Sequence, residues 1–196
     1  MIEVERKFRV TAAQKESLTR SATLQRQVEN TDQYFDFDDL RLMKSDCWLR
    51  KRNNTWELKI TRDSNFATRR ADIYDELTRK EDIQRHLGLD LAEAIHQKLL
   101  RSWAHLQTSR AHYEANDYSL DFDDIRSLED DFTYQLMEIE IMVVSPEQID
   151  DATQRILTLA TQHGLDLERP LGKVLAYFHE RKPSVFDQLN AAWSAT

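Results

Sequence analysis

Hydrophobic and polar side chains alternate along much of this chain, as they do along strands that have one buried face. In the first eight residues, Ile2, Val4 and Phe8 share one face with Arg6, while Glu3, Glu5 and Lys7 share the other. On that face two carboxylates stand about 7 Å apart with an ammonium next in line. This spacing suits a hard cation beside a phosphate, although Glu and Lys are also common on solvated strands.

A second stretch with the same alternation lies near the other end of the chain. In residues 136–143, Glu138 and Glu140 again stand between apolar side chains. A run this apolar is expected in the centre of a sheet, where a buried carboxylate needs an ionic partner or a metal. Two strands that each carry a Glu-x-Glu pair therefore favour a binding site over a solvated surface.

The rest of the pattern predicts further strands and several helices. Strands are expected at residues 24–30, 31–37, 67–78, 99–107, 109–115 and 117–123, with a loop at 127–131. Helices are expected at residues 11–20, 80–87, 91–99, 145–162, 172–181 and 184–193. Thr11 begins a capping box, and Gly88 suits the left-handed end of a helix. We count about eight antiparallel strands, with helices in the middle and at the end.

Residues 47–60 predict a hairpin that turns at an Asn-Asn pair and has a basic face. Its first strand places Trp48, Arg50 and Arg52 on one face, and its second places Glu57 and Lys59 opposite the apolar residues. The planar guanidinium fork matches the geometry of a phosphate, so the arginines favour oxyanion binding. A solvated basic ribbon is the alternative.

Nearly every predicted strand has one apolar and one charged face. A soluble barrel usually turns its apolar face inward, but here helices are available to cover that face from outside. The predicted fold is therefore α+β: a closed eight-stranded antiparallel barrel, or tunnel, with a charged interior and flanking helices, in a single domain over residues 1–196. Closure would also remove exposed sheet edges.

Composition narrows the function classes. The 196 residues include 27 Lys and Arg against 35 Asp and Glu, a net charge of −8 that disfavours binding to nucleic acid or to an anionic membrane. Three glycines cannot build a phosphate-binding Gly-rich loop, and the six histidines show no metal-site clustering. A lone Cys47 and the lack of a signal peptide or membrane-length run lead us to expect a soluble, cytoplasmic monomer.

Several motifs together resemble the CYTH superfamily, the triphosphate tunnel metalloenzymes, over nearly the whole chain. They are Glu3-x-Glu5-x-Lys7, Arg50-x-Arg52, Glu57-x-Lys59, Glu138-x-Glu140 and Lys173 at the start of a late helix. Within the superfamily the likeness is greatest to the thiamine triphosphatase branch. The resemblance implies an eight-stranded tunnel that holds a small-molecule triphosphate and one or two divalent cations, usually Mg²⁺, with Mn²⁺ as the alternative.

The resemblance also implies roles for individual residues. The implied metal ligands are Glu3, Glu5, Asp121, Glu138 and Glu140. The implied substrate-binding residues are Lys7, Arg50, Arg52, Lys59, Glu76, Arg110, Lys173 and, by ring stacking, Trp48. Either Asp121 or Asp123 could face the tunnel, and we choose Asp121. Six basic and six acidic positions would make the empty site nearly neutral, so a metal would be needed for a highly charged anion to bind.

Two further hypotheses concern single side chains. Lys59, near Tyr34, is expected to orient or activate the attacking water, with a pKa lowered by neighbouring cations. Trp48 is expected to stack on a cationic heteroaromatic ring at the tunnel mouth, the alternative being an ordinary core tryptophan.

Two classes of function remain. One is an enzyme that hydrolyses a triphosphate by in-line attack of water, with thiamine triphosphate as leading substrate, inorganic triphosphate second and nucleotide cyclisation third. The other is a non-catalytic module that binds polyphosphate.

Overall fold

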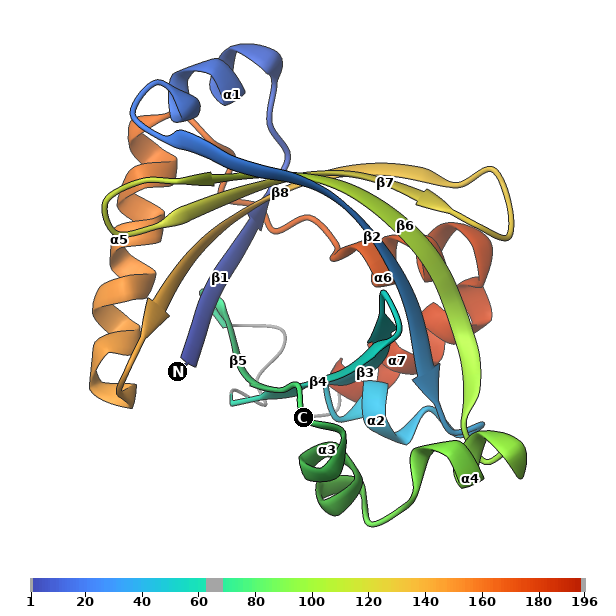
Figure 1. Ribbon diagram of the computed structural model, residues 1–196. Coiled ribbons are helices and arrows are strands. Elements are labelled where there is room, and N and C mark those ends of the chain that lie inside the picture. Colours follow the sequence, from blue (N-terminus) through green and yellow to red (C-terminus); the bar gives the residue numbers. More distant parts are fainter. Residues whose placement is uncertain (1, 63–68, 195–196) are drawn as a thin grey trace.

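Eight antiparallel strands close into a barrel in the computed structural model, which describes residues 2–62 and 69–194 (Figure 1). Around the barrel the strands follow the order β1-β5-β4-β3-β2-β6-β7-β8. They are β1 (Ile2–Phe8), β2 (Thr23–Asp36), β3 (Cys47–Arg52), β4 (Thr55–Thr61), β5 (Asp72–Leu77), β6 (Arg101–Glu114), β7 (Ser119–Ser127) and β8 (Thr133–Val143). The predicted fold class is confirmed.

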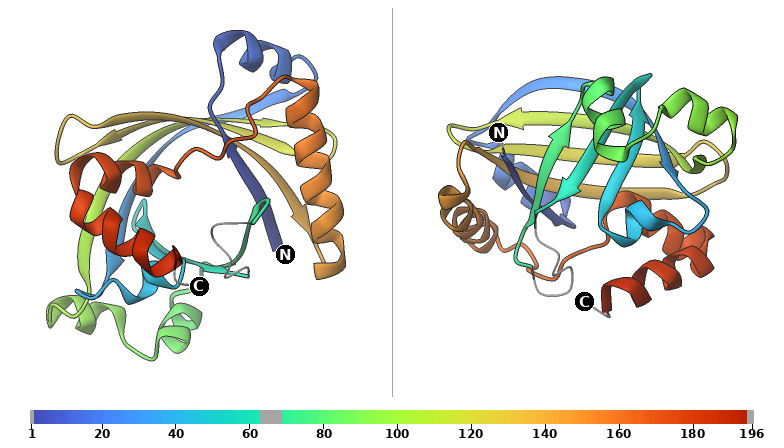
Figure 2. Two further views of the ribbon diagram at one scale, coloured as in Figure 1. Left: turned by 180° about the vertical axis from the view of Figure 1, so that it is seen from behind. Right: turned by 90° about the horizontal axis from the view of Figure 1, so that it is seen from below.

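Helices lie around this barrel, as Figures 1 and 2 show. They are α1 (Ala12–Thr19), α2 (Arg41–Lys44), α3 (Lys80–Leu87), α4 (Leu91–His96), the 3₁₀ turn η1 (Pro146–Gln148), α5 (Ile149–Gln162), α6 (Lys173–Arg181) and α7 (Pro183–Ser194). The capping box at Thr11 and the left-handed Gly88 are present as predicted. Among the described residues, no helix combines the length and apolar character needed to cross a membrane.

Two predicted strand breaks are wrong. The strands expected at 24–30 and 31–37 form the single strand β2, and those at 99–107 and 109–115 form β6. β2 and β6 pair with one another along their length, with irregularities near Leu24 and Tyr34. Polar residues such as Thr108 suggested a break, but they stay within the ladder because polar side chains can face the interior of this barrel.

Three boundaries also differ from the prediction. β5 begins at Asp72, and residues 67–68 of the expected strand lie outside the described part of the chain. β7 continues to Ser127, and α4 ends at His96 rather than near residue 99.

The helices bury the outer apolar faces of the strands. α5 packs on β1 and β8, where Ile156 joins the fully buried Val4 and Ile139 in one cluster. On the far side of the barrel, Ile83 of α3 packs in one cluster with Leu49 of β3 and Leu58 of β4. Because the outward faces are covered, the opposite faces of the same strands must line the interior.

One part of the interior is apolar and is filled by α6. Register places Leu106 on the same face as the inward Asp32, and Leu136 on the same face as Glu138. These residues pack in one cluster with Val174 and Phe178 of α6. The charged interior predicted from the sequence is therefore confined to the remaining part of the barrel.

The hairpin between β3 and β4 turns at Asn53 and Asn54, as predicted. Their φ angles of 46° and 71° are left-handed, which is the requirement of a two-residue type I′ turn. The Asn53 side chain also accepts a hydrogen bond from the Thr31 N–H at 2.9 Å and donates one to Asn30 at 3.0 Å. This turn sets the register that places the basic residues of β3 inside the barrel.

We expect Asn54→Ala to lower the free energy of unfolding by about 1 kcal/mol, because alanine adopts the left-handed conformation at a steric cost. Asn54→Gly should not have this cost. Urea denaturation of both variants and the wild-type protein measures the difference. Equal stability of the alanine and glycine variants would contradict the assignment of the turn.

Candidate active site

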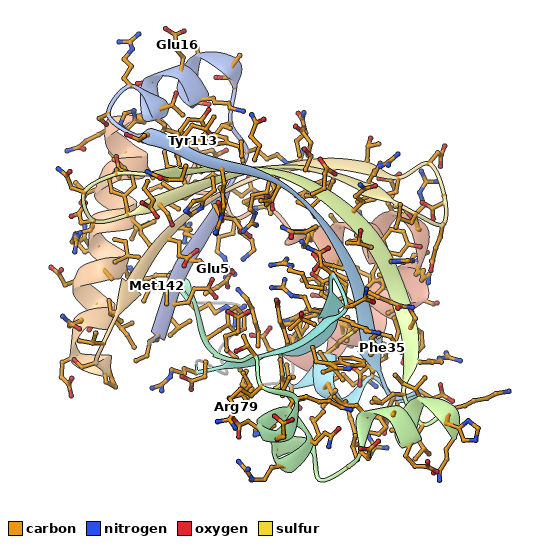
Figure 3. All side chains as sticks on the ribbon, in the orientation of Figure 1. Glu5, Glu16, Phe35, Arg79, Tyr113 and Met142 are labelled. Atoms are coloured by element: carbon orange, nitrogen blue, oxygen red, sulfur yellow. The ribbon has the colours of Figure 1, made fainter. Side chains whose placement is uncertain are left out.

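A cavity of about 430 Å³ lies inside the barrel and is lined by the inner strand faces together with residues of α6 and α7. Figure 3 shows Glu5 among the side chains that point into the space enclosed by the strands. Among the described residues, the basic lining side chains are Lys7, Arg50, Arg52, Lys59, Arg69, Arg110, Arg169 and Lys173, eight in all. The acidic ones are Glu3, Glu5, Asp46, Asp72, Glu76 and Glu138, six in all.

Further carboxylates pair with these lining cations. Besides the six acidic residues of the lining, Asp32, Glu57, Asp121 and Asp123 form ion pairs with basic residues of the cavity. An anion can therefore bind here where guanidinium and ammonium groups exchange a carboxylate for its oxygens.

The charged face of β1 is held by two ammonium groups. The Lys59 Nζ lies 2.5 Å from Oε2 of Glu3 and 3.5 Å from Oε2 of Glu5. The Lys7 Nζ donates to Glu5, lies 2.9 Å from the Asp72 Oδ2, and lies 3.7 Å from Oε1 of Glu138. The implied metal ligands of β1 are thus together and already neutralised by lysines.

The carboxylates in this region affect one another's pKa. Burial raises the pKa of Glu5, but Lys59 and Lys7 outweigh burial and hold the pKa far below its usual range. Glu140 lies opposite Glu5 in the β1–β8 ladder, and burial together with the charges of Glu3 and Glu5 raises the pKa of Glu140 to about 8. Negative charge is therefore crowded on this side of the barrel even with the lysines in place.

Such an all-oxygen donor set fits a hard divalent cation such as Mg²⁺, which would relieve the crowding at Glu140. Among residues 2–62 and 69–194, no three Asp, Glu, His or Cys side chains are already arranged as a metal site, because the carboxylates here are paired with lysines. The carboxylate oxygens suit Mg²⁺ chemically, but to bind it they would have to exchange a lysine for the metal.

On the opposite side, one buried carboxylate holds several cations. Asp32 is fully buried and accepts from the Arg52 Nε at 2.7 Å and from the Lys173 Nζ at 2.6 Å. Burial raises the pKa of Asp32, but Lys173 and Arg50 outweigh it and hold the pKa well below its ordinary value. The Arg50 Nη2 also lies 2.6 Å from Oε2 of Glu57. The sequence-predicted basic residues of β3 and α6 therefore converge here.

Arg110 connects the two sides. Its guanidinium donates to Asp123 at 2.6 Å, to Asp121 at 2.5 Å and to Oε2 of Glu138 at 2.8 Å. Both aspartates of β7 thus face the interior, so the choice between them that the sequence left open does not arise. Asp121 also lies 2.6 Å from Nδ1 of His112.

The expectation of a lowered pKa at Lys59 is wrong. Burial lowers the pKa of Lys59, but the adjacent Glu5 and Glu3 raise it by more than burial lowers it. The pKa is therefore above its ordinary value, and the side chain stays protonated. Its ammonium lies 5.5 Å from the ring centroid of Tyr74. Tyr34 lines the same cavity and stands opposite Arg50 in the β2–β3 ladder.

Trp48 also lines the cavity, on the same face of β3 as the arginines. Its Nε1 donates to Oδ1 of Asp46 at 2.8 Å, and its ring centroid lies 6.4 Å from that of Trp193 in α7. Glu76, at the rim, is 35% exposed and lies 3.5 Å from Nη2 of Arg50. Both residues therefore belong to the site that the sequence predicted.

Sequence reasoning missed several charged and aromatic residues of the site. They are Asp32, Asp46, Arg69, Asp72, Arg169 and Trp193. Asp32 could have been found, because it lies two residues before Tyr34 on a predicted strand and therefore shares its face. Arg69 and Arg169 stand outside regular strands and helices, so no periodicity marked them.

The chain is similar to known proteins in sequence and in fold. Residues 1–169 match the CYTH domain. Over 206 aligned residues it is 28% identical to the thiamine-triphosphatases of Macaca fascicularis and of Homo sapiens, with 96% of this chain and 89% of each of those proteins covered. Among solved structures, the PH1819 protein from Pyrococcus horikoshii OT3 has a TM-score of 0.67 at 17% identity, covering 91% of this chain and 99% of that one.

Removal of the buried carboxylate of Asp32 should destabilise the protein strongly. We expect Asp32→Ala to lower the free energy of unfolding by about 3 kcal/mol, because Arg52 and Lys173 would face one another without their shared partner. Glu29→Ala, at an exposed position of the same strand, is the matched control. Chemical denaturation measures both, and equal small losses would contradict a central role for Asp32.

Proposed function

The chain belongs to the CYTH domain family, and on that premise we propose that it hydrolyses a triphosphate, with thiamine triphosphate as the leading substrate. The observation that carries the proposal is the cavity in which cations from β1, β3, β4, β6 and α6 face a group of carboxylates. The similarity to two thiamine-triphosphatases over 96% of the chain supports the choice of substrate. A cavity of about 430 Å³ is in the range of small-ligand sites.

In the proposed reaction, water attacks the terminal phosphorus in line with the bridging oxygen. The bond between that phosphorus and the bridging oxygen breaks, and the products are thiamine diphosphate and inorganic phosphate. Arg50, Arg52, Arg110, Lys7 and Lys173 would hold the phosphate oxygens, exchanging part of their present carboxylate contacts for the substrate. Catalysis of this type depends on positioning and on electrostatic stabilisation, and needs no covalent intermediate.

The carboxylates Glu3, Glu5, Asp121, Glu138 and Glu140 would hold Mg²⁺, or Mn²⁺. When bound, the cation supplies positive charge that neutralises the phosphate oxygens. This arrangement separates the site into an acidic side for the metal and a basic side for the phosphate chain.

Lys59 and Tyr34 retain proposed roles at the reacting end. A protonated Lys59 cannot accept a proton, so we assign it to charge stabilisation of the phosphate rather than to general-base catalysis. Tyr34 lines the cavity opposite Arg50, and we assign its hydroxyl the role of orienting the attacking water by a hydrogen bond.

Inorganic triphosphate is the second candidate substrate, because the basic lining of the cavity is all that a bare phosphate chain requires. The aromatic side chain of Trp48 beside Arg50 favours a substrate that also carries a ring. A non-catalytic polyphosphate-binding module would use the same cations without turnover.

The test is phosphate release from thiamine triphosphate, inorganic triphosphate and ATP, each measured with Mg²⁺ and with EDTA. We expect the highest kcat/KM for thiamine triphosphate with Mg²⁺ and loss of activity on chelation. Arg110→Ala should lower kcat/KM by at least about 100-fold, since a charge-assisted contact in the transition state contributes several kcal/mol. Release of phosphate from none of the three compounds would contradict the proposed enzyme and support the non-catalytic polyphosphate-binding module.

Lys59 should compete with the metal for Glu3 and Glu5. We expect Lys59→Met to bind Mn²⁺, without triphosphate, on the order of tenfold more tightly than the wild-type protein, because the cation no longer displaces an ammonium. Electron paramagnetic resonance of free Mn²⁺ measures this directly. Lys80→Met, at an exposed helix start, is the control, and weaker Mn²⁺ binding by Lys59→Met than by this control would refute the competition.

A further inference from the structure

His112 is a largely buried histidine inside the barrel that the proposed function does not use. It projects from β6 on the same face as Arg110, two residues earlier, and only 12% of its side chain is exposed. Its ring Nδ1 lies 2.6 Å from Oδ1 of Asp121, while its Nε2 lies 3.7 Å from Oε1 of Glu114. The first distance is that of a hydrogen bond to a charged group, and the second is too long for a hydrogen bond.

The direction of the bond between His112 and Asp121 follows from the chemistry of its partners. A carboxylate has only acceptor oxygens, so the hydrogen of this contact belongs to Nδ1 of the ring. The other oxygen of the same carboxylate, Oδ2, accepts from Nη1 of Arg110 at 2.5 Å. Asp121 is therefore held at both oxygens, by a different donor at each.

Strand pairing places His112 at one end of a row of charged groups. His112 stands opposite Asp121 in the β6–β7 ladder, and Asp121 stands opposite Glu138 in the β7–β8 ladder. Glu138 in turn stands opposite Lys7 in the β1–β8 ladder. Two carboxylates are thus direct neighbours in the middle of the row, where like charges repel. The row has a donor at each end, Lys7 beside Glu138 and the imidazole beside the aspartate.

The two donors of Asp121 differ in what the proposed reaction asks of them. Arg110 contacts Asp123 through two nitrogens, each at 2.6 Å, but contacts Asp121 through one. A bidentate pair is the stronger of the two arrangements. When Arg110 turns to a phosphate oxygen, the single contact to Asp121 is therefore the one it gives up more readily. His112 holds the other oxygen, so Asp121 keeps a donor and its orientation.

An oriented carboxylate serves a metal ion better than a mobile one. Carboxylates that bind metals accept hydrogen bonds from residues that do not touch the metal, and these bonds fix the direction of the ligand. An oxygen that accepts one hydrogen bond still has a lone pair for a cation. The contact from His112 is thus compatible with metal binding at Asp121.

We propose that His112 is a positioning residue of the metal site. Its Nδ1–H holds Asp121 in the direction from which the carboxylate binds a divalent cation, and keeps it there when Arg110 turns to the phosphate. The inference rests on the proposed function, in which Asp121 is one of the metal ligands. It adds a residue that the family resemblance does not imply.

The test is binding of Mn²⁺ without triphosphate, measured by electron paramagnetic resonance of the free ion. We expect His112→Ala to raise the Kd about tenfold, since loss of a supporting hydrogen bond weakens metal binding by roughly 10- to 100-fold. His112→Asn should keep most of the affinity, because its amide nitrogen is as many bonds from the backbone as the ring Nδ1. His112→Gln carries the same amide one bond farther out and should lose affinity as the alanine variant does. His105→Ala, on the opposite face of β6, is the control and should bind like the wild-type protein.

A double-mutant cycle shows whether His112 acts through Asp121. In an Asp121→Ala background, His112→Ala should cause no further loss of Mn²⁺ affinity, because the hydrogen bond is already absent. A general structural role of the imidazole would cause the same loss in both backgrounds, and that result would overturn the inference.

Folding and turnover are measured separately from metal binding. Thermal melting identifies a variant that has not folded, and if His112→Ala does not fold, the comparison of His112→Gln with His112→Asn takes its place. Equal Mn²⁺ affinity in the asparagine and glutamine variants, or no Mn²⁺ binding by the wild-type protein, would overturn the inference. Mn²⁺ binding that depends on His112, in a protein that releases phosphate from no triphosphate, would overturn the proposed enzyme and keep the positioning role.

Discussion

The structure depends on pairing opposite charges inside the barrel. A buried ion without a partner costs several kilocalories per mole, so cations and carboxylates can share an interior only if register brings them face to face. Cross-strand positions do this: Lys7 with Glu138, Asp32 with Arg52, Arg50 with Glu57, Lys59 with Glu76, and Arg110 with Asp123. A slip of one residue in any strand would turn these groups outward and place apolar side chains in the interior.

The same pairing explains how an acidic protein can hold a cavity lined with arginine and lysine side chains. Each cation is already neutralised when the cavity is empty, so the fold does not depend on a bound anion for its stability. Under the proposed function, a triphosphate would enter because two of its oxygens can pair with the fork of a guanidinium as a carboxylate does. In the proposed reaction, the carboxylates released by that exchange would then be available for a metal. The acidic and basic residues of the interior thus stabilise one another in the empty barrel.

Much of this could be predicted from the sequence, because a barrel with a charged interior leaves a period-two pattern on every strand. Glu3, Glu138 and Glu140 stood out since each lies between apolar neighbours, and Glu5 stood out since it follows Glu3 at a spacing of two. Residues 30–31 and 108 misled the prediction, because polar side chains inside a strand look like a break unless the interior is known to be polar.

The parts that could not be predicted depend on contacts between distant segments. Arg69 and Asp46, which precede β5 and β3, meet because these strands both pair with β4. Trp193 meets Trp48 because α7 packs against α2. The charge state of Lys59 likewise follows from the surrounding Glu5 and Glu3, whose effect on its pKa outweighs that of the neighbouring Arg50. Local pattern carries no information about such partners.

The pairing of β1 with β5 and β8 has a consequence for biosynthesis. β1 precedes the other seven strands in the chain, yet its partner β8 is completed only at Val143. Contacts so distant in sequence form slowly, since the chain loses the entropy of closing a long loop before the contacts can stabilise it. Glu3 and Glu5 therefore meet their neighbours on β8 only after the other strands have been synthesised, and a nascent or truncated product without β8 has no assembled pocket.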